Sequence, residues 1–470
     1  MTEIAGNGVA APRGRGEPPV AADQLPEPED RRIMSRNRVG VMSGQDERFA
    51  GNEQAHWCEG GRPMCAARRC GGWAGVMVWG VLPLVAEVVP ATTTAAPPVF
   101  ESQTIDDQLE IGYGLVPADV DGDGRPDIVL ADKTRFVWYR NPDWKKFVLA
   151  ERLTVHDNVC VAARDIDGDG KAELAVGANW NPSDTVDSGS VHYLVAPADR
   201  TQPWQAVKLH HEPTVHRMHW VQVDRQQYVL VVSPLHGRGN RNGEGAGARL
   251  LAYSIPKDVR QPWPTTLLDD SMHMTHNLDP CQWYAGTPAE ELLYIGREGA
   301  LLLYLDNGKW KKMVLERVEG GGEIRMVVLA GGRRAVATIE PMHGDRLVLY
   351  VSDQRGDAAP GTPVSFVERV LLDDNFQGGH AIAAGDLVAN PGQEIVAGWR
   401  LPNRDGKVGL KLYWAVDPDG RQWESCWLDE NGMATEDARL ADLDGDGRLD
   451  VIAAGRATKN LKIYWNRSQP

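Results

Sequence analysis

Cysteine and basic residues are scarce in this 470-residue sequence. It carries 50 Lys and Arg against 65 Asp and Glu, which gives a formal net charge of −15. The six cysteines are Cys58, Cys65, Cys70, Cys160, Cys281 and Cys426. The last three are too few and too widely spaced to form a disulfide framework. A net negative chain without a Lys/Arg run also repels phosphates, so nucleic acid is excluded as an expected partner.

Several motifs of common enzymes are also missing. The sequence has no Ser-His-Asp elbow, no glycine-rich phosphate loop, no GxGxxG turn and no CxxC pair. These absences disfavour acyl transfer, nucleotide chemistry and dithiol redox chemistry. What the sequence does contain is 50 Gly and 30 Pro, a composition that suits many short strands joined by tight turns.

An unusual segment precedes the regular part of the chain. From Met64 the sequence has two arginines, an apolar run over residues 71–86 and then small residues. This layout predicts a signal peptide over residues 64–96, with residues 1–63 disordered or upstream of the true start. The run is too short and too interrupted to favour a stable membrane span. We therefore expect a secreted, periplasmic or cell-surface protein; the alternative is an apolar linker in a cytosolic protein.

An aromatic residue followed by a short strand and acidic or polar residues recurs along the chain. The copies begin at Phe100, Trp144, Trp204, Trp263, Trp310, Phe366 and Trp423. Their spacings are 44, 60, 59, 47, 56 and 57 residues. Repeats of this period indicate a solenoid or a propeller.

A second recurring strand, which ends in an aromatic residue, decides between these two architectures. It starts at residues 136, 191, 250, 301, 347, 410 and 461. The last copy has no aromatic-led strand after it, and the first aromatic-led strand, at Phe100, has no partner before it. The two ends therefore complete each other, as in a closed ring without a free sheet edge. Together with nearly continuous apolar strands such as DIVLA and ELAVGA, this predicts an all-β, seven-bladed β-propeller over residues 99–470, closed by the N-terminal strand.

Asp-rich loops are the clearest candidate metal sites. Three read DVDGDGRPD, DIDGDGKAE and DLDGDGRLD, and a fourth, DLVANPGQE, keeps only positions 1, 5 and 9. Side-chain oxygens at positions 1, 3, 5 and 9 and the carbonyl of position 7 can surround one hard cation. The predicted ligands are Asp119, Asp121, Asp123, Arg125, Asp127, Asp165, Asp167, Asp169, Lys171, Glu173, Asp386, Asn390, Glu394, Asp442, Asp444, Asp446, Arg448 and Asp450. We expect about three structural Ca²⁺ sites; the alternative is acidic turns without metal.

These loops resemble those of the FG-GAP or VCBS repeat family. In that family DxDGDGxxD precedes an apolar strand that ends in Gly, as in the propellers of integrin α-subunits and many secreted bacterial proteins. The resemblance implies calcium-bearing propeller blades. It does not imply an activity, because the fold hosts binding proteins and enzymes alike.

Polar residues recur at one position of the repeat, opposite the Asp-rich loops. Counting from the end of each aromatic-led strand gives Tyr113, His156, His216, His276, Glu323, His380 and Glu436. We expect them to gather around the axis as catalytic residues. Loops on the same face add expected substrate-binding residues, namely Asn179, Trp180, His236, Arg238, Arg297, His343, Trp399 and Arg400.

Imidazoles and carboxylates around one axis predict a transition-metal site. Zn²⁺, Mn²⁺ or iron suits such ligands, and a metal in an open cavity can polarise a carbonyl. The His-rich column and the strand-end His-Gly motifs PLHGRGN and EPMHGD resemble the propeller of aldos-2-ulose dehydratases, although no cupin domain follows. The expected function is binding of a carbohydrate or small sugar-derived ligand, with metal-assisted lyase or dehydratase chemistry. The alternative is a non-catalytic adhesion propeller that binds a protein.

Overall fold

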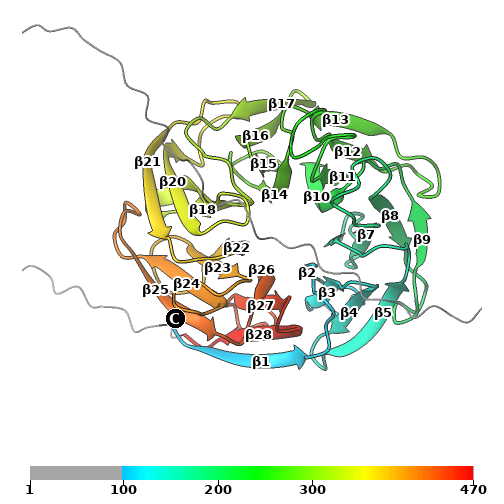
Figure 1. The fold of residues 1–470 in the computed structure, drawn as a ribbon, viewed down its shortest axis with the longest axis horizontal. Helices are drawn as coiled ribbons and strands as arrows, with labels where there is room; N and C mark the ends of the chain where they lie inside the picture. The colour runs from blue at the N-terminus through cyan, green and yellow to red at the C-terminus, as the bar shows by residue number, and fades with distance from the viewer. Residues whose placement is uncertain (1–97, 469–470) are drawn as a thin grey trace, which may run out of the picture. The chain divides into compact units, whose positions relative to one another are not determined.

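The fold consists of seven four-stranded antiparallel sheets arranged around an axis (Figure 1). The computed structural model describes residues 98–468, so the predictions for residues 1–63 and 64–96 lie outside it. Within residues 98–468 no helix is long and apolar enough to cross a membrane. The structure thus confirms the predicted all-β, seven-bladed propeller.

Each sheet is one blade, with its first strand next to the axis. Blade 1 holds β2 (Gly114–Ala118), β3 (Asp127–Ala131), β4 (Arg135–Arg140) and β5 (Lys145–Glu151). Blade 2 holds β6 (Cys160–Arg164), β7 (Glu173–Ala178), β8 (Ser190–Val195) and β9 (Gln205–Lys208). Blade 3 holds β10 (Val215–Asp224), β11 (Gln227–Pro234), β12 (Leu250–Ser254) and β13 (Thr265–Asp269). Blade 4 holds β14 (Thr275–Cys281), β15 (Glu291–Gly296), β16 (Gly299–Asp306) and β17 (Lys309–Val314).

The remaining blades complete the ring. Blade 5 holds β18 (Glu323–Val328), β19 (Arg333–Glu340), β20 (Arg346–Arg355) and β21 (Phe366–Asp373), with the short 3₁₀ segment Ala330–Gly332 before β19. Blade 6 holds β22 (Gly379–Gly385), β23 (Glu394–Trp399), β24 (Gly409–Ala415) and β25 (Trp423–Glu430). Blade 7 holds β26 (Thr435–Ala441), β27 (Asp450–Gly455), β28 (Asn460–Asn466) and β1 (Phe100–Asp106).

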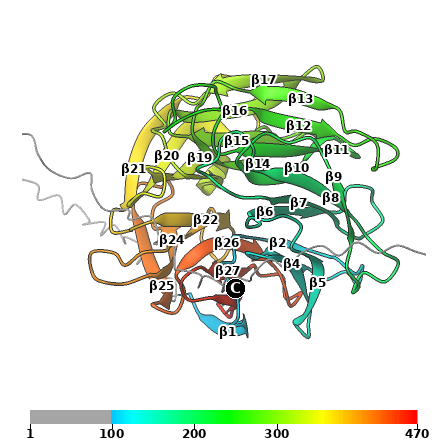
Figure 2. The ribbon, with the colours of Figure 1, turned by 45° about the vertical axis from the view of Figure 1, so that its right-hand side comes forward.

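The predicted ring closure is present in blade 7. Strand β1 pairs antiparallel with β28, from Phe100 opposite Asn466 to Asp106 opposite Leu461. Figures 1 and 2 show β1 on the outside of the sheet that contains the C-terminal strand. The first strand of the fold therefore covers the edge that the last strand would otherwise expose.

The hydrophobic core lies between the faces of neighbouring blades. One cluster joins Leu115 and Ile128 of blade 1 to Ile452 and Ile463 of blade 7, and the other clusters span adjacent blades in the same way. The second strands are buried along their whole length in β3, β7, β15, β23 and β27. This burial explains their nearly continuous apolar sequence.

The acidic residues that end the aromatic-led strands join one blade to the next. Asp373, at the end of β21, accepts a hydrogen bond of 2.8 Å from the Tyr413 hydroxyl and one of 3.0 Å from Lys411 Nζ of blade 6. Asp429 in β25 receives the same pair of donors from Tyr464 and Lys462 of blade 7, at 2.8 and 2.7 Å. The repeated acidic residue is therefore a contact between blades.

One buried histidine of the fold gives a prediction for acid stability. His192 in β8 is 7% exposed, its Nδ1 has no hydrogen-bond partner, and burial lowers its pKa to about 4. The unfolded chain binds this proton near its ordinary pKa of about 6.5, so the stability is complete above that pH and falls as the pH drops towards 4. The loss is about 3 kcal/mol at most.

We expect the variant His192→Phe to lose less stability than the wild type between pH 7 and pH 5. Chemical denaturation at the two pH values measures this difference. His210→Phe, at a half-exposed position in the loop between β9 and β10, is the matched control. Equal pH dependence in His192→Phe and wild type would contradict the assignment.

Candidate functional site

Irregularities in the innermost strands place polar side chains at the axis. In β14, Thr275 pairs with Gly296 and Asn277 with Ile295, which leaves His276 as an extra residue. His216 in β10, His380 in β22 and Glu436 in β26 are skipped in the same way. Such bulges redirect a side chain out of the regular ladder.

Three imidazoles meet near the axis. The Nε2 atoms of His276 and His343 are 2.7 Å apart, and the rings of His276 and His380 have centroids 5.1 Å apart. The rings of His343 and His380 stack with centroids 4.9 Å apart. One ligand atom from each of these histidines lies within 4.8 Å of the others. The three residues come from blade 4, from the turn between β19 and β20 of blade 5, and from blade 6.

Backbone carbonyls hold the buried rings in one tautomer. His276 Nδ1 lies 2.8 Å from the Gly322 carbonyl, and His380 Nδ1 lies 2.6 Å from that of Glu436. His216 Nδ1 lies 3.0 Å from the His276 carbonyl. A carbonyl can only accept, so each Nδ1 carries the proton and each Nε2 keeps its lone pair. Burial lowers the pKa of all three rings, which keeps them neutral at pH 7.

Two buried glutamates flank the cluster in different environments. Glu323 accepts a hydrogen bond from the Asn277 amide through Oε2, while its Oε1 lies 3.1 Å from His276 Nδ1. That nitrogen donates to the Gly322 carbonyl, and Oε1 has no hydrogen-bond partner. Glu436 instead accepts from Arg400 at 3.2 Å and from Arg456 at 3.1 Å. Glu436 is therefore neutralised by two guanidinium groups.

The other two of the seven residues predicted to gather around the axis, Tyr113 and His156, lie outside the imidazole cluster. Tyr113 precedes β2, and its buried hydroxyl donates a 2.9 Å hydrogen bond to Asp157 Oδ2. Its ring faces Arg456 at 5.4 Å, which connects it to Glu436. His156 is exposed in the loop between β5 and β6 and does not belong to the imidazole cluster. His156 lies four residues before β6 begins at Cys160, whereas His216, His276 and His380 lie within the innermost strands of their blades.

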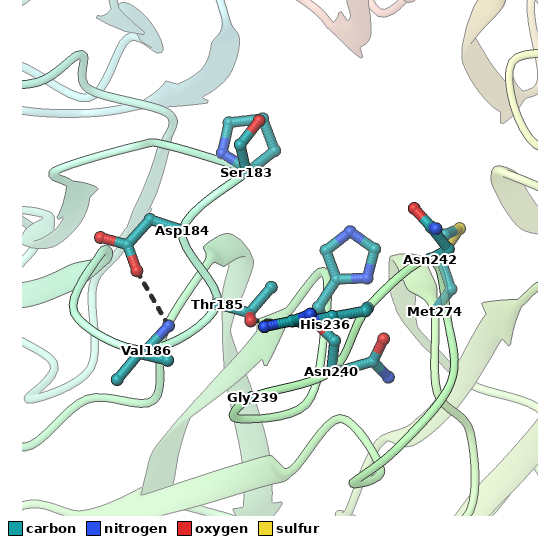
Figure 3. A pocket seen from close by; sticks show the side chains of 11 residues that line it. Ser183, Asp184, Thr185, Val186, His236, Gly239, Asn240, Asn242 and Met274 are labelled. Carbon is teal, nitrogen blue, oxygen red and sulfur yellow. Dashed lines mark hydrogen bonds between the residues drawn. The ribbon is translucent and has the colours of Figure 1, made fainter.

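A pocket of about 610 Å³ opens beside the cluster, between loops of blades 2 and 3 (Figure 3). Its lining residues are Pro182, Ser183, Asp184, Thr185, Val186, His236, Gly239, Asn240, Arg241, Asn242 and Met274. In Figure 3 the His236 ring stands between the loop that carries Asp184 and the one that carries Asn242. His236 Nδ1 and Asn240 Oδ1 are buried without a hydrogen-bond partner. We call this space the outer pocket.

The outer pocket lies close in sequence and space to the imidazoles. Met274 lines it two residues before His276, and it forms an isolated bridge with His236. The Trp180 ring packs on His216 with centroids 4.9 Å apart, and the His216 ring lies 4.5 Å from that of His276. The aromatic rings thus continue from blade 2 to the cluster.

Two arginines that were predicted to bind substrate form hydrogen bonds with backbone carbonyls of the loops. Arg297 donates to the carbonyls of Asn242 and Gly243, and Arg238 donates to that of Val186, so both hold loops of the outer pocket. Asn179 has a positive φ of 57° at the start of the loop after β7. Trp399 was expected to offer a flat face to a ligand. This expectation is wrong, because the ring is fully buried and stacked on Phe376.

The three complete Asp-rich loops bring carboxylates together on the opposite face. Oxygens of Asp119, Asp121 and Asp127 lie within 4.8 Å of one another, as do those of the corresponding residues in the other two loops: Asp165, Asp167, Glu173, Asp442, Asp444 and Asp450. Burial raises the pKa of Asp127 and Glu173 to about 7 and that of Asp450 to about 6. A set of oxygen ligands from carboxylates fits a hard cation.

The fourth loop differs from these three. It supplies only two carboxylates, Asp386 and Glu394, and Glu394 Oε2 accepts hydrogen bonds from the backbone of Leu387 and Val388. Val388 stands where the other loops have an aspartate. This loop therefore lacks the third carboxylate of the others.

Comparison with known proteins agrees with this architecture. An FG-GAP-like repeat matches residues 119–176, and an FG-GAP repeat matches residues 161–194. Residues 119–194 are thus similar to FG-GAP repeats. Residues 188–353 match the family described as aldos-2-ulose dehydratase, beta-propeller domain. Both resemblances expected from the motifs are thereby confirmed, the first over residues 119–194 and the second over residues 188–353. No curated protein matches the sequence.

Solved structures show more distant similarity. The crystal structure of BBS1N in complex with ARL6DN is 13% identical, with a TM-score of 0.48, over 78% of this chain and 97% of that chain. Hydrazine synthase of Kuenenia stuttgartiensis is 12% identical, with a TM-score of 0.46, over 81% of this chain and 99% of that chain.

The sequence-based reasoning misjudged two features of the site. His343 was expected on the rim, but it joins His276 and His380. Its motif EPMHGD was a usable signal, since a His in a tight turn after a buried strand can point back over the axis. Arg217, which directly follows His216, was not predicted at all. Nothing in its local sequence distinguishes it from a surface arginine.

Proposed function

We propose that this protein binds a sugar-derived carbonyl compound at the imidazole cluster and eliminates water from it with the help of a transition metal. The observation that carries this proposal is the convergence of His276, His343 and His380. Two of these rings have Nδ1 fixed by a carbonyl and Nε2 available as a ligand atom. Histidines that bind Zn²⁺ or a related cation usually have this arrangement, in which a hydrogen bond from one ring nitrogen fixes the tautomer and the other nitrogen binds the metal.

Protein groups beside the cluster can supply the proton transfers. A bound divalent metal would polarise the substrate carbonyl and acidify the neighbouring C–H bond. His216 is neutral, and its Nε2 carries a lone pair that Arg217 Nη1 approaches only to 3.4 Å, so it can accept that proton. The C–H electron pair then forms the C=C bond while the C–O bond to the leaving hydroxyl breaks. The protonated His216 would return its proton to the departing oxygen, which leaves as water.

A carbohydrate is the ligand class that the outer pocket supports. Its volume of about 610 Å³ accommodates a sugar unit, and His236 Nδ1 and Asn240 Oδ1 offer unused polar atoms to hydroxyl groups. Trp180 adds an aromatic surface next to His216. Together these groups match the mixture of polar edges and apolar faces of a sugar ring.

The remaining parts of the proposal concern calcium and location. Each of the three complete Asp-rich loops would hold one structural Ca²⁺ ion, because three carboxylates at this proximity repel one another without a cation. FG-GAP repeats support this assignment. Export from the cytoplasm, from a signal peptide over residues 64–96, would supply the millimolar calcium that such sites use.

A protein-binding role is the second candidate. Loops on the face of the imidazoles expose Val155, Val186 and Leu401, with exposed fractions of 96%, 50% and 51%. Exposed aliphatic side chains on one face are typical of interaction surfaces. If this role is correct, replacing these three residues with Ser should abolish partner binding without changing metal content.

Metal content tests the leading proposal. We expect the purified full chain to bind about one Zn²⁺ or Mn²⁺ that His343→Ala and His380→Ala fail to bind, while calcium remains. His343 is exposed in a turn, so its replacement should leave the fold intact. His210→Ala is the control for a half-exposed histidine outside the cluster. Inductively coupled plasma mass spectrometry and circular dichroism measure the two properties. Equal metal content in all four proteins would refute the site.

A further inference from the structure

Three arginines follow the polar residues of the innermost strands, and two of them, Arg217 and Arg325, are buried. Arg217 in β10, Arg325 in β18 and Arg439 in β26 have the same local arrangement. In each, Nη1 donates to the carbonyl of the preceding residue, at 3.1, 2.6 and 2.9 Å. The strands β10, β18 and β26 that carry them lie on the inner side of their blades, where they surround the centre of the ring (Figure 1).

The three arginines differ in their counter-charges. Arg439 Nη1 lies 2.6 Å from Asp437 Oδ1, and Arg325 Nε lies 3.8 Å from Asp279 Oδ1. Among residues 98–468, no carboxylate lies within 4.0 Å of the Arg217 guanidinium, although this residue is only 7% exposed. Its recorded contacts are the carbonyl and, at 3.4 Å, the Nε2 of His216. Arg217 is therefore a buried cation without a salt-bridge partner in this part of the chain, although its charge helps to lower the pKa of the buried Glu323.

Arg217 lies directly beside the imidazole cluster. The His216 ring that it contacts is 4.5 Å from the His276 ring. His276 belongs to blade 4, whereas His216 and Arg217 belong to blade 3. The contact between the two rings therefore brings Arg217 next to the cluster from a neighbouring blade.

Elementary electrostatics makes such a group unusual. Buried charges in proteins are normally paired or bound to a ligand, because desolvation of an isolated charge is costly. The planar guanidinium fork matches the two oxygens of a carboxylate better than it matches any neutral group. An unpaired, buried arginine next to a ligand site is therefore typical of a carboxylate-binding position.

We propose that Arg217 binds the carboxylate of the substrate, which makes the substrate a sugar acid such as a uronate. The proposal rests on the proposed function, because it concerns the same site. The carboxylate would lie against Arg217 while the neighbouring carbon atoms face His276, His343 and His380. Neutralising the carboxylate also stabilises the negative charge that develops when the adjacent C–H bond loses its proton.

Binding of matched sugars tests this assignment. We expect the zinc-loaded full chain to bind D-galacturonate at least ten times more tightly than D-galactose, measured by isothermal titration calorimetry at low ionic strength. In Arg217→Gln this preference should fall to less than twofold. Arg217→Lys, which keeps the charge and loses the fork, should give an intermediate preference. Arg421→Gln, at an exposed arginine of blade 6, is the control for a change in net charge.

The outcomes separate this inference from the proposed function. Equal affinity of the wild type for galacturonate and galactose, or no binding of galacturonate, would overturn the role of Arg217, even if zinc is bound. Galactose 6-sulfate that binds as tightly as galacturonate would also overturn it, since the site would then recognise charge alone. Absence of zinc from the wild type would instead refute the metal site, and an Arg217-dependent preference for galacturonate would still stand. If Arg217→Gln fails to fold, the preference of the wild type and of Arg217→Lys decides.

Discussion

Deletion of residues 98–106 is expected to lower the melting temperature of the propeller by about 10 °C. The deletion removes β1 and with it the backbone pairing to six residues of β28. It also removes Asp106, which accepts hydrogen bonds from Tyr139 at 2.5 Å and Lys146 at 2.6 Å in blade 1. With about six hydrogen bonds of the β1–β28 pairing and the two to Asp106 lost at about 1 kcal/mol each, the free energy of unfolding falls by about 8 kcal/mol, which corresponds to a shift of about 10 °C for a domain of this size.

Thermal unfolding followed by circular dichroism measures this loss. Asp106→Asn is a useful control, since it weakens the contact with blade 1 and keeps the β1–β28 pairing. It should give a much smaller shift. The deletion should also increase aggregation, because β28 becomes an exposed edge. An unchanged melting temperature would show that the ring does not depend on closure by β1.

Removal of calcium is expected to have the second large effect. If each complete loop holds one ion at about 100 times its dissociation constant, each ion contributes about 2.7 kcal/mol, and three ions about 8 kcal/mol. Excess chelator should therefore lower the melting temperature strongly, and added calcium should restore it in a saturable way. Differential scanning calorimetry at several calcium concentrations measures the effect.

Variants of single loops give the matched comparison. Asp121→Asn, Asp167→Asn and Asp444→Asn each replace the position 3 carboxylate, and each should remove about a third of the calcium-dependent stabilisation. Asp386→Asn changes the fourth loop, which has only two carboxylates, and should leave the calcium dependence unchanged. Stability that is insensitive to chelator in the wild type would contradict calcium binding by these loops.

The repeated strands could be predicted from the sequence because the strand at a given position makes similar contacts in each blade. The strands predicted to end in aromatic residues are β4, β8, β12, β16, β20, β24 and β28. In three of these strands the tyrosine hydroxyl reaches an acidic residue of the preceding blade: Tyr139 reaches Asp106, Tyr413 reaches Asp373 and Tyr464 reaches Asp429. Closure was predictable for a similar reason, since an unpaired strand at each end can be satisfied only by pairing the two.

The site was less predictable, because its geometry depends on departures from the repeat. Bulges bring four side chains to the axis, those of His216, His276, His380 and Glu436. Counting residues from the preceding strand finds a bulge only where the loop in between has the expected length. His156 follows the same count and lies exposed. Trp399 resembles a binding residue in sequence, but Phe376, 23 positions earlier, covers its ring. Contacts between distant segments decided both outcomes.

Different blades supply the imidazole cluster and the outer pocket, so the two parts of the site can change independently during evolution. The three clustered imidazoles come from blades 4, 5 and 6, whereas the outer pocket is formed mainly by the long loops of blades 2 and 3. Substitutions, insertions or deletions in those loops can alter which molecule is recognised while the geometry of the imidazoles stays constant. Related propellers that share the three histidines would then differ most in residues 182–186 and 236–242, and exchanging these two segments should transfer ligand preference between them.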